Sequence, residues 1–394
     1  MRRRIYTMVR KYDVIIIGAG ASGMMAAATL IKRNKTVAVL EMGERPGRKI
    51  SVSGGGRCNI TNADANYHRY FGKNPNFTRS ALTRFRPLDI LEWAKKHQIT
   101  IVEKTPGRYF CENGADVVLN ALVHDVRGAD LFCECVVTDV HKENNIFTIT
   151  TNQKTFLANS VIVATGGVSF ESLGVSDIGY KIAKKFGHKI EPIRPGLCAI
   201  DIQNLFPVEL SGISVDAEIQ IDKNIVQDSM LITHLGIGGP CAYRTSLYSM
   251  AHGITINLAP GVDVFDVLKN AKHISGRKNI SGVLGQILPT RLAKWIAGND
   301  NRNIADVKDT ELKQIAQKTQ NIFVEHDKIK LHSLRDAEIT YGGVSTELIS
   351  SKTMESKLCS GLFFVGEVLD ISGDLGGFNL HWAWASGFVA GENA

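Results

Sequence analysis

Three glycines near the start of the chain are spaced to bind the diphosphate of a dinucleotide. They lie between an apolar, strand-like run over residues 12–17 and a helix-like run over 24–31. In this setting Gly18 would form a tight turn, Gly20 would let the backbone approach the phosphates, and Gly23 would let the helix pack closely on the strand. The first turn of the helix adds free N–H groups and the positive end of its dipole. The predicted diphosphate contacts are Gly18, Gly20, Ala21, Ser22 and Gly23.

An acidic residue follows this turn at the distance expected of a ribose ligand. The apolar run 36–40 ends in Glu41, and a ribose-binding carboxylate lies roughly 20 residues after such a turn. It binds the free hydroxyls of a ribose and disfavours a 2′-phosphate. The pattern therefore indicates the adenosine half of FAD or NAD rather than NADP, with Glu41 and Met42 beside the ribose.

A second glycine-rich segment, residues 47–62, follows the ribose-binding strand. It contains three consecutive glycines flanked by serine, arginine and asparagine. Such a loop can lie flat against a ligand with its N–H groups pointing at it. The alternative, a flexible linker, is disfavoured because linkers lack specific polar anchors of this kind. We expect cofactor contacts from Arg48, Lys49, Ser53, Gly54, Gly55, Gly56, Arg57, Cys58 and Asn59.

The carboxyl-terminal end of the chain repeats the arrangement of strand, glycine-rich loop and helix. An apolar run over 361–365 ends in Gly366 and Glu367, and a glycine-rich loop over 373–377 precedes a helix-like run over 381–391. The loop again offers backbone N–H groups and a helix amino terminus to an anion. We therefore expect both ends of the chain to form one cofactor site; the alternative is an ordinary surface strand and helix.

On these segments the chain resembles the HI0933-like flavoproteins, a family of FAD-dependent oxidoreductases that includes proteins similar to bile-acid reductases and aminoacetone oxidases. The run 47–62 carries the most specific resemblance. Residues 161–167, 233–240 and 337–344 resemble further segments of the family, in the same order along the chain. The resemblance covers almost the whole chain and implies a bound FAD.

The resemblance also implies roles for individual residues. Those implied on the ribityl and diphosphate side of FAD are Glu367 and Asp370, and those implied at the flavin ring are Gly376, Gly377, Asn379 and Leu380. Further implied contacts with the cofactor are Val137, Thr165, Gly166, Gly167, Gly366 and Phe378. His381 departs from the family pattern, which often has glutamine there. Substrate identity is therefore the least transferable property.

A chain of 394 residues is longer than one compact core usually holds, so two or three structural units are expected. Short alternating runs after the first domain favour an antiparallel β-barrel, and a helical period follows it. The expected fold class is α/β: a Rossmann-like, three-layer (ββα) FAD-binding domain with an inserted antiparallel β-barrel and helical subdomain. The expected bounds are 1–11 for a basic tail, 12–190 with 335–394 for the FAD-binding domain, 191–261 with 326–334 for the barrel, and 262–325 for the helices.

The formal net charge of +7 has a simple explanation in this scheme. The tail alone supplies five basic residues, FAD carries two phosphates, and the other lysines and arginines form no long block. Nucleic acid is therefore not expected as a partner.

The cysteines give no sign of a metal or of a disulfide framework. Seven are present, without a C-x-x-C pair or a metal-ligand pattern. This usage favours a reducing cytoplasm and predicts no bound metal. No apolar run reaches the roughly 20 residues that span a bilayer, so no membrane association is expected.

Only one dinucleotide fingerprint is present, so a reduced nicotinamide would bind transiently. The leading hypothesis is a reductase or dehydrogenase of a small or medium apolar organic substrate, with NAD(P)H as donor and the flavin performing the hydride chemistry. The alternatives are a flavin oxidase of amine-like substrates that uses O2, and a flavin-dependent RNA-modifying or regulatory binder. His234 and His381 are weak candidates for a proton donor, because a packing role is favoured for each. The substrate, the redox partner, the general acid and the oligomeric state are left open.

Overall fold

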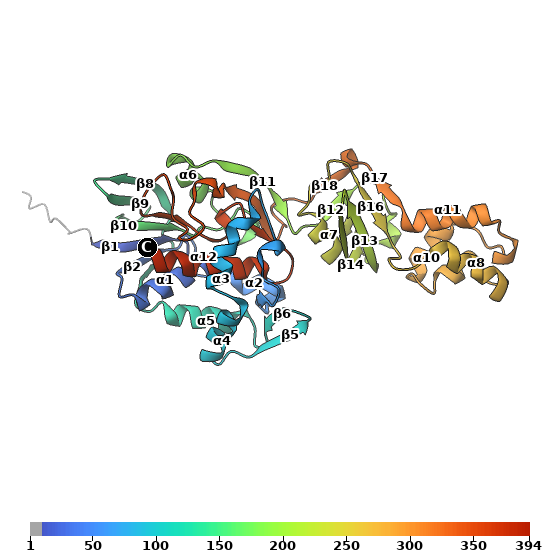
Figure 1. The fold of residues 1–394 in the computed structure, drawn as a ribbon, viewed down its shortest axis with the longest axis horizontal. Helices are drawn as coiled ribbons and strands as arrows, with labels where there is room; N and C mark the ends of the chain where they lie inside the picture. The colour runs from blue at the N-terminus through green and yellow to red at the C-terminus, as the bar shows by residue number, and fades with distance from the viewer. Residues whose placement is uncertain (1–9) are drawn as a thin grey trace, which may run out of the picture. The chain divides into compact units, whose positions relative to one another are not determined.

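The computed structural model describes residues 10–394, which divide into two compact units (Figure 1). One unit comprises the chain up to Arg194 together with Ile339–Ala394, and the other comprises Pro195–Glu338. The basic tail predicted for residues 1–11 lies outside the described residues, except for Arg10 and Lys11. Lys11 is the first residue of β1, so the first strand begins within the predicted tail.

The first unit is built on a seven-stranded sheet of mixed direction. Its strands are β1 (Lys11–Ile17), β2 (Val37–Leu40), β7 (Asp130–Phe132), β8 (Val137–Glu143), β9 (Ile146–Thr151), β10 (Thr155–Val163) and β20 (Leu362–Phe364). The hydrogen-bonded order is β7-β2-β1-β10-β9-β8, and β20 also pairs with β10. β1, β2, β7, β10 and β20 are parallel, whereas β8, β9 and β10 form an antiparallel meander. The predicted Rossmann-like α/β fold is confirmed.

Two helices from opposite ends of the chain pack along one another in this unit. They are α1 (Ala21–Lys32) and α12 (Phe378–Asn393), and they lie side by side in Figure 1. Glycines permit the contact: a Cβ atom on Gly387 would lie 2.3 Å from the Ser22 carbonyl oxygen, and one on Gly391 would lie 2.7 Å from Thr29 Cβ. Trp382 and Trp384 of α12 are fully buried in the same core.

Smaller elements complete the first unit. The helices are α2 (Arg48–Gly56), α3 (Arg79–Arg84), α4 (Pro87–Lys96), α5 (Ala115–Asp125) and α6 (Ile178–Lys185). The strands form three short sheets: β3 (Asn59–Asn62) with β6 (Arg108–Cys111) and β5 (Ile101–Thr105), β4 (Tyr70–Phe71) with β21 (Ser372–Gly373), and β11 (Ile190–Gly196) with β19 (Ile339–Val344). The sequence predicted a loop over this segment; residues 48–52 are helical, whereas Ser53, Gly54 and Gly55 within the bounds of α2 have non-helical backbone angles.

The second unit has its own core and its own seven-stranded sheet, in which every pairing is antiparallel. Its strands are β12 (Ile200–Ile202), β13 (Ser214–Ile221), β14 (Asn224–Ile232), β15 (Gly236–Gly238), β16 (Ile254–Asn257), β17 (Ile322–Val324) and β18 (Ile329–Leu331). The order is β17-β16-β13-β14-β15-β12-β18. Because β17 and β18 are the two ends of this order, we describe it as a sheet and not as a closed barrel.

Five helices belong to the second unit: α7 (Gly239–Thr245), α8 (Val264–Ile274), α9 (Ile280–Leu284), α10 (Thr290–Ala297) and α11 (Asp309–Gln320). The last four follow one another between β16 and β17, where the sequence predicted a helical segment. One boundary differs, since β17 lies inside the range 262–325 predicted as helical. Ile322 and Val324 pair there with Ile256 and Ile254 of β16, and this sheet pairing ends the helical stretch.

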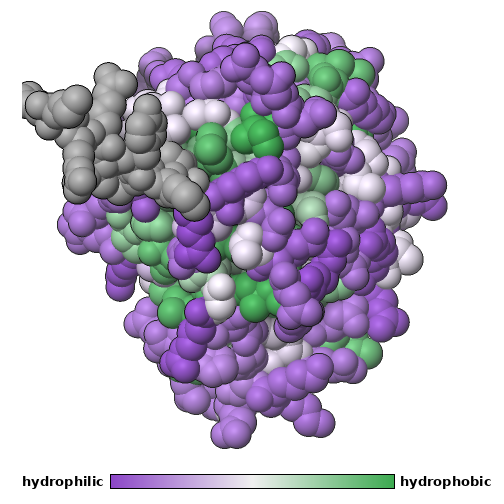
Figure 2. Space-filling view, turned by 90° about the vertical axis from the view of Figure 1, so that its left-hand side faces the viewer, coloured by the Kyte–Doolittle hydropathy of each residue, from purple (hydrophilic) through white to green (hydrophobic). Residues whose placement is uncertain are grey.

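In Figure 2, hydrophilic residues predominate and apolar ones form small separate groups on the face shown. Among residues 10–394, no helix combines the length and the apolar character needed to cross a bilayer.

The α1–α12 contact predicts that one methyl group added to α12 lowers the stability of the protein. In Gly387→Ala, alanine is the better helix former by about 1 kcal/mol, but its Cβ would collide with backbone of α1. We expect a net loss of about 1–3 kcal/mol in the free energy of unfolding, measured as a lower Tm by circular dichroism. Gly20→Ala is the control, with both variants melted without flavin, because its Cβ meets no heavy atom within 4 Å and alanine can adopt its φ of −79°. An unchanged or raised Tm in Gly387→Ala would show that the two helices do not need this close approach.

Candidate flavin site

Four parallel strands of the first unit end at segments that were predicted to bind a cofactor. β1 leads into Gly18, β2 into Glu41, β10 into the turn at Thr165, and β20 into Gly366. Carboxyl ends of parallel strands meet at one edge of a sheet, which is where nucleotides bind in open α/β folds. The structure therefore brings residues from both ends of the chain to one edge.

The three glycines of the first turn differ in their surroundings. A Cβ on Gly18, whose φ is +105°, would lie 2.4 Å from the Ala164 carbonyl oxygen, and one on Gly23 would lie 2.0 Å from the Gly18 carbonyl oxygen. A Cβ on Gly20 would meet no heavy atom within 4 Å. Gly20 is also the N-cap of α1 and provides no side-chain cap. Two glycines therefore serve packing, and the third faces open space in front of a helix amino terminus.

Backbone groups hold the Glu41 carboxylate in place. Its Oε2 accepts a hydrogen bond from the Ala19 N–H at 2.9 Å, and its Oε1 accepts one from the Gly43 N–H at 2.8 Å. Arg48 Nη2 lies 3.7 Å from Oε1, and Glu41 is buried. An ionised carboxylate has about four acceptor positions. The Glu41 carboxylate can therefore still accept hydrogen bonds from the hydroxyls of a ribose.

An ion pair joins the second glycine-rich segment to the carboxyl-terminal one. Lys49 Nζ lies 2.8 Å from Glu367 Oε2 and donates a hydrogen bond to Ser169 Oγ at 3.0 Å. Glu367 Oε1 accepts a hydrogen bond from the Thr340 N–H at 2.8 Å. Thr340 Oγ1 in turn accepts from the N–H groups of Val168 and Ser169. Four segments that are distant in sequence are fixed to one another by this network.

Sequence reasoning missed two members of this network, Ser169 and Thr340. Thr340 lies within the run that resembles the family, so the resemblance could have pointed to it. Nothing in the spacing of either residue indicates that it would contact Glu367. Glu367 was assigned to the ribityl and diphosphate side of the cofactor, and both of its oxygens are engaged by protein groups.

The glycine turn at the carboxyl-terminal end of α2 is exposed and has left-handed backbone conformations. Gly54, Gly55 and Gly56 have φ values of +58°, +67° and +80°, and a Cβ on Gly55 would meet nothing within 4 Å. Arg57 beside them is exposed. Cys58 is fully buried, and burial raises the pKa of its thiol to about 12. The turn therefore offers backbone N–H groups to a ligand, whereas Cys58 is an inert packing residue.

The turn after β10 also exposes part of its backbone at the edge of the sheet where the cofactor is expected. Gly166 has a φ of +72° and faces open space, whereas a Cβ on Gly167 would lie 2.3 Å from Thr340 Oγ1. Thr165 lies against Gly179 of α6.

The carboxyl-terminal loop folds back on β3. A Cβ on Gly377, whose φ is +94°, would lie 2.5 Å from the Thr61 carbonyl oxygen, and Trp384 Nε1 donates to the Ile60 carbonyl oxygen at 2.9 Å. The side chain of Asn379 bridges the loop, accepting from the Gly373 N–H and donating to the Gly373 carbonyl oxygen. α12 begins at Phe378 without a side-chain cap. A second helix therefore begins at a glycine-rich loop with no side-chain cap on its N–H groups.

Not every predicted contact presents its side chain. Val137 and Phe378 are buried in the core, so only their backbone could reach a ligand. Met42 and Leu380 keep part of their surface exposed. Gly376 lies against Arg108, with φ of +118°.

The two weak candidates for a proton donor, His234 and His381, lie in different units and differ in burial. His381 is fully buried, with Nδ1 2.9 Å from Thr61 Oγ1 and Nε2 3.1 Å from the Phe85 carbonyl oxygen. Burial lowers the pKa of its ring to about 4. It is therefore a neutral packing residue and a poor proton donor. His234 is exposed in the turn between β14 and β15, in the second unit.

Asp370 lies against the backbone of the first unit. Its Oδ2 accepts a hydrogen bond from the Lys73 N–H at 2.8 Å, and its side chain is 2% exposed. Burial raises the pKa of this carboxyl to about 6. The sequence assigned it to the ribityl side of the cofactor, and the structure gives it a protein partner.

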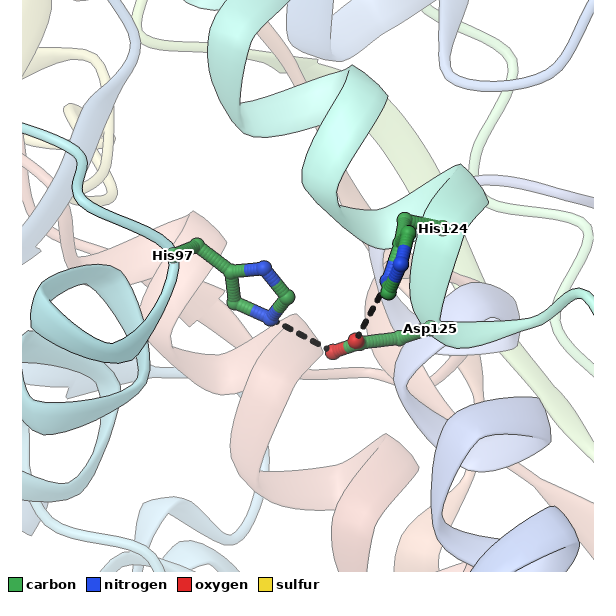
Figure 3. Close-up of side chains that lie close together, drawn as sticks. All are labelled: His97, His124 and Asp125. Atoms are coloured by element: carbon green, nitrogen blue, oxygen red, sulfur yellow. Dashed lines mark hydrogen bonds and ion pairs between the residues drawn. The ribbon is translucent and has the colours of Figure 1, made fainter.

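The sequence predicted no bound metal, yet the fold brings three potential ligands together. His97 at the end of α4 and His124 and Asp125 at the end of α5 have ligand atoms within 4.8 Å of one another (Figure 3). Asp125 Oδ2 already accepts hydrogen bonds from Trp93 Nε1 at 2.7 Å and from His97 Nε2 at 3.1 Å. These bonds join α4 to α5, and we assign the group a structural role on them.

Comparison with known proteins agrees with this geometry. The family described as HI0933-like protein Rossmann domain matches residues 12–393. The chain is 34% identical to a ribosomal RNA dihydrouridine synthase of Escherichia coli, over 98% of both chains. It is 36% identical to a protein of the same name from Haemophilus influenzae, over 95% of this chain and 96% of that one. A 3-dehydro-bile acid delta(4,6)-reductase of Clostridium scindens is 27% identical, over 96% and 98% of the two chains. The chain is a flavin-dependent oxidoreductase.

The open space at Gly20 predicts a variant that loses the flavin and keeps the fold. In Gly20→Val the new side chain occupies the space in front of α1, at a φ of −79° that valine can adopt. We expect purified Gly20→Val to lack the visible absorbance of flavin. The Tm of flavin-free protein should match that of flavin-free wild type within a few degrees. If Gly20→Val retains a full complement of flavin, the phosphates of the cofactor do not bind next to Gly20.

The raised pKa of Asp370 predicts how stability depends on pH. The folded protein holds this proton up to about pH 6, whereas the unfolded chain releases it near 3.8. Stability therefore falls as pH rises through this window, and the loss persists above it. Asp370→Asn cannot ionise and keeps an acceptor for the Lys73 N–H.

In flavin-free protein we expect Asp370→Asn to unfold at a higher Tm than wild type at roughly pH 8, by on the order of 1–3 kcal/mol in the free energy of unfolding. The gap should close near pH 4. Thermal melts at both pH values test this, and an equal gap at both would show that ionisation of Asp370 is not its cause.

Proposed function

This chain belongs to the HI0933-like family, and from that premise we propose that it is an FAD-dependent enzyme that reduces a uracil base of ribosomal RNA to dihydrouracil. NAD(P)H is the proposed source of the hydride. The observation that carries the proposal is the similarity to two relatives with the same printed name, at 34% and 36% identity over nearly the whole of each chain.

This proposal replaces the leading hypothesis drawn from the sequence. A small or medium apolar substrate was expected, and nucleic acid was not expected as a partner. The names of the two relatives speak against that second expectation and favour the RNA-modifying alternative. A steroid-like substrate is the second candidate function, supported by the 27% identity to the bile-acid reductase. The amine oxidase gains no support from these names.

Both candidate functions are the same type of reaction. Dihydrouracil and the product of a delta(4,6)-reductase arise when a carbon–carbon double bond conjugated to a carbonyl gains two hydrogens. In uracil the hydride goes to C6 and the proton to C5. When bound, a reduced flavin supplies the hydride, and NAD(P)H supplies the two electrons that restore it.

The residues of the site favour FAD over a flavin mononucleotide. Glu41 lies at the end of β2 with backbone groups holding both oxygens, in the position from which a carboxylate binds the ribose of an adenosine. FAD carries that ribose, whereas a flavin mononucleotide has only the open ribityl chain. The uncapped amino terminus of α1 behind Gly20 suits the diphosphate.

Other residues of the site order the segments around the cofactor. The Lys49–Glu367 ion pair and the hydrogen bonds of Thr340 fix the turn after β10 to the carboxyl-terminal segment. The first-turn N–H groups of α12 would stabilise negative charge on a flavin ring bound beside them. When the fold already holds these segments in place, less entropy is lost as the substrate and the flavin take up the geometry in which they react.

Three measurements on the purified protein test the proposal. The released cofactor is identified by chromatography against FAD and FMN standards. The flavin is mixed anaerobically with NADH and, separately, with NADPH, and we expect rapid bleaching with at least one. Ribosomal RNA that lacks dihydrouridine is then incubated with enzyme and that donor, and we expect a mass gain of two hydrogens on one uridine. Gly20→Val is the control that should give no product.

The outcomes separate the candidate functions. Bleaching without dihydrouridine, combined with reduction of a bile-acid dienone, would favour the steroid reductase. Release of FMN would refute the assignment of FAD. Failure of both nicotinamides to bleach the flavin would refute NAD(P)H as the donor.

A further inference from the structure

The two parts of the second unit carry opposite charge. The helical segment 263–320 has ten lysines and arginines against six aspartates and glutamates. The strand-bearing remainder, 195–262 with 321–338, has five basic residues against ten acidic ones. The helices therefore form a basic region within a unit that is otherwise acidic.

Most acids of the helical segment are already engaged. Asp300 and Glu311 both pair with Arg302, and Asp309 pairs with Lys272. The side chain of Asp263 accepts the Asp266 N–H at the start of α8.

Eight basic side chains stand outside these ion pairs, and all of them are exposed. They are Lys269, Arg277, Lys278, Arg291, Lys294, Lys308, Lys313 and Lys318.

Two of these lysines share one face of the α8–α11 pair. Lys269 of α8 and Lys313 of α11 lie 5.8 and 5.4 Å from the centroid of the Phe265 ring. The helices run antiparallel, since Lys272 pairs with Asp309 further along the same seam. Both helices lie together at one end of the second unit (Figure 1). The ring of Phe265 therefore holds two ammonium groups near one another on the surface.

The face continues along α11 as an open, shallow depression. Lys313, Gln314, Gln317 and Lys318 line it. Lysines supply positive charge for phosphates, and glutamine amides can donate to and accept from hydroxyl groups. The depression thus combines the two kinds of group that contact an RNA backbone, phosphate and 2′-hydroxyl.

We propose that this face, defined by Phe265, Lys269, Lys313, Gln314, Gln317 and Lys318, binds the sugar–phosphate backbone of the RNA substrate. The inference rests on the proposed function. Backbone contacts position an RNA without reading its sequence. The helical segment is therefore an anchor for the folded RNA, and the base is chosen at the flavin site. An anionic membrane is a poorer match, because an interfacial helix inserts an apolar face beside its lysines, and the only aromatic residue of this set, Phe265, is half-buried.

The test reverses charge on this face in the full-length holoenzyme. Lys269→Glu/Lys313→Glu is compared with Lys32→Glu/Lys95→Glu, which makes the same charge change at exposed lysines of the first unit. Binding to a ribosomal RNA fragment is measured by filter retention across a salt series. We expect the first variant to bind at least about tenfold more weakly at low salt, with the log–log salt slope reduced by about 2. Its flavin content and its bleaching by NAD(P)H should equal those of wild type, and the control variant should bind normally.

Other outcomes overturn the inference. Equal losses in both variants would show a non-specific charge effect, and unchanged RNA binding would place the anchor elsewhere. If Lys269→Glu/Lys313→Glu no longer sediments with phosphatidylserine vesicles but still binds RNA, the face is a membrane-binding surface instead.

Failure of the proposed function is distinguishable from failure of the anchor. If wild type makes no dihydrouridine, the proposed function fails. The RNA-binding measurements still show whether the face binds RNA. If wild type and Lys269→Glu/Lys313→Glu make dihydrouridine with the same KM, the anchor fails and the function stands.

Discussion

The structure depends on the close approach of the first and last helices of the chain. α1 and α12 come close enough for a Cβ on Gly387 to meet the backbone at Ser22, and that approach fixes where the carboxyl-terminal segment begins and ends. Trp382 Nε1 donates to the Gly366 carbonyl oxygen, and the Gly366 N–H donates to Ser386 Oγ. The helix therefore holds the end of β20 beside the first glycine turn. Without this contact nothing would hold the segment after β20 beside the first glycine turn, and the two halves of the flavin site would not come together.

Buried carboxylates make the same assembly specific. An ionised carboxylate is costly to bury unless its oxygens are hydrogen-bonded or paired. Glu41 satisfies that demand with backbone N–H groups of its own neighbourhood, whereas Glu367 needs Lys49 and Thr340 from two other segments. Glu367 can therefore be satisfied only when the fold is complete. A local group prepares the adenosine end of the site, and a long-range network closes the other end.

The parts of the site that the sequence predicted are those set by local rules. The division of labour among Gly18, Gly20 and Gly23 follows from what each position in a strand–turn–helix must do, and Glu41 follows from the length of the unit. Long-range packing decided the rest. His381 accepts from Thr61 and donates to Phe85 because the start of α12 is buried against both, and no spacing along the chain shows this. β17 escaped prediction because three residues are too few to carry a period, and pairing with β16 defines it. His97 and Asp125 met for the same reason, through the packing of α4 on α5.

The net charge shows how an average over the sequence can hide a feature of the fold. Read along the chain, the lysines and arginines look scattered, and that reading argued against nucleic acid. Sorted by folded part, the second unit divides into basic helices and acidic strands. The flavin site rests on elements of the first unit, and the relatives named for an RNA base and for a bile acid belong with this chain over nearly its whole length. Because one type of hydride addition serves both substrates, the difference between them must be made by groups that touch the substrate beyond its double bond. The inserted unit has its own core and its own charge pattern, so its sequence can vary without disturbing the core that carries the flavin site.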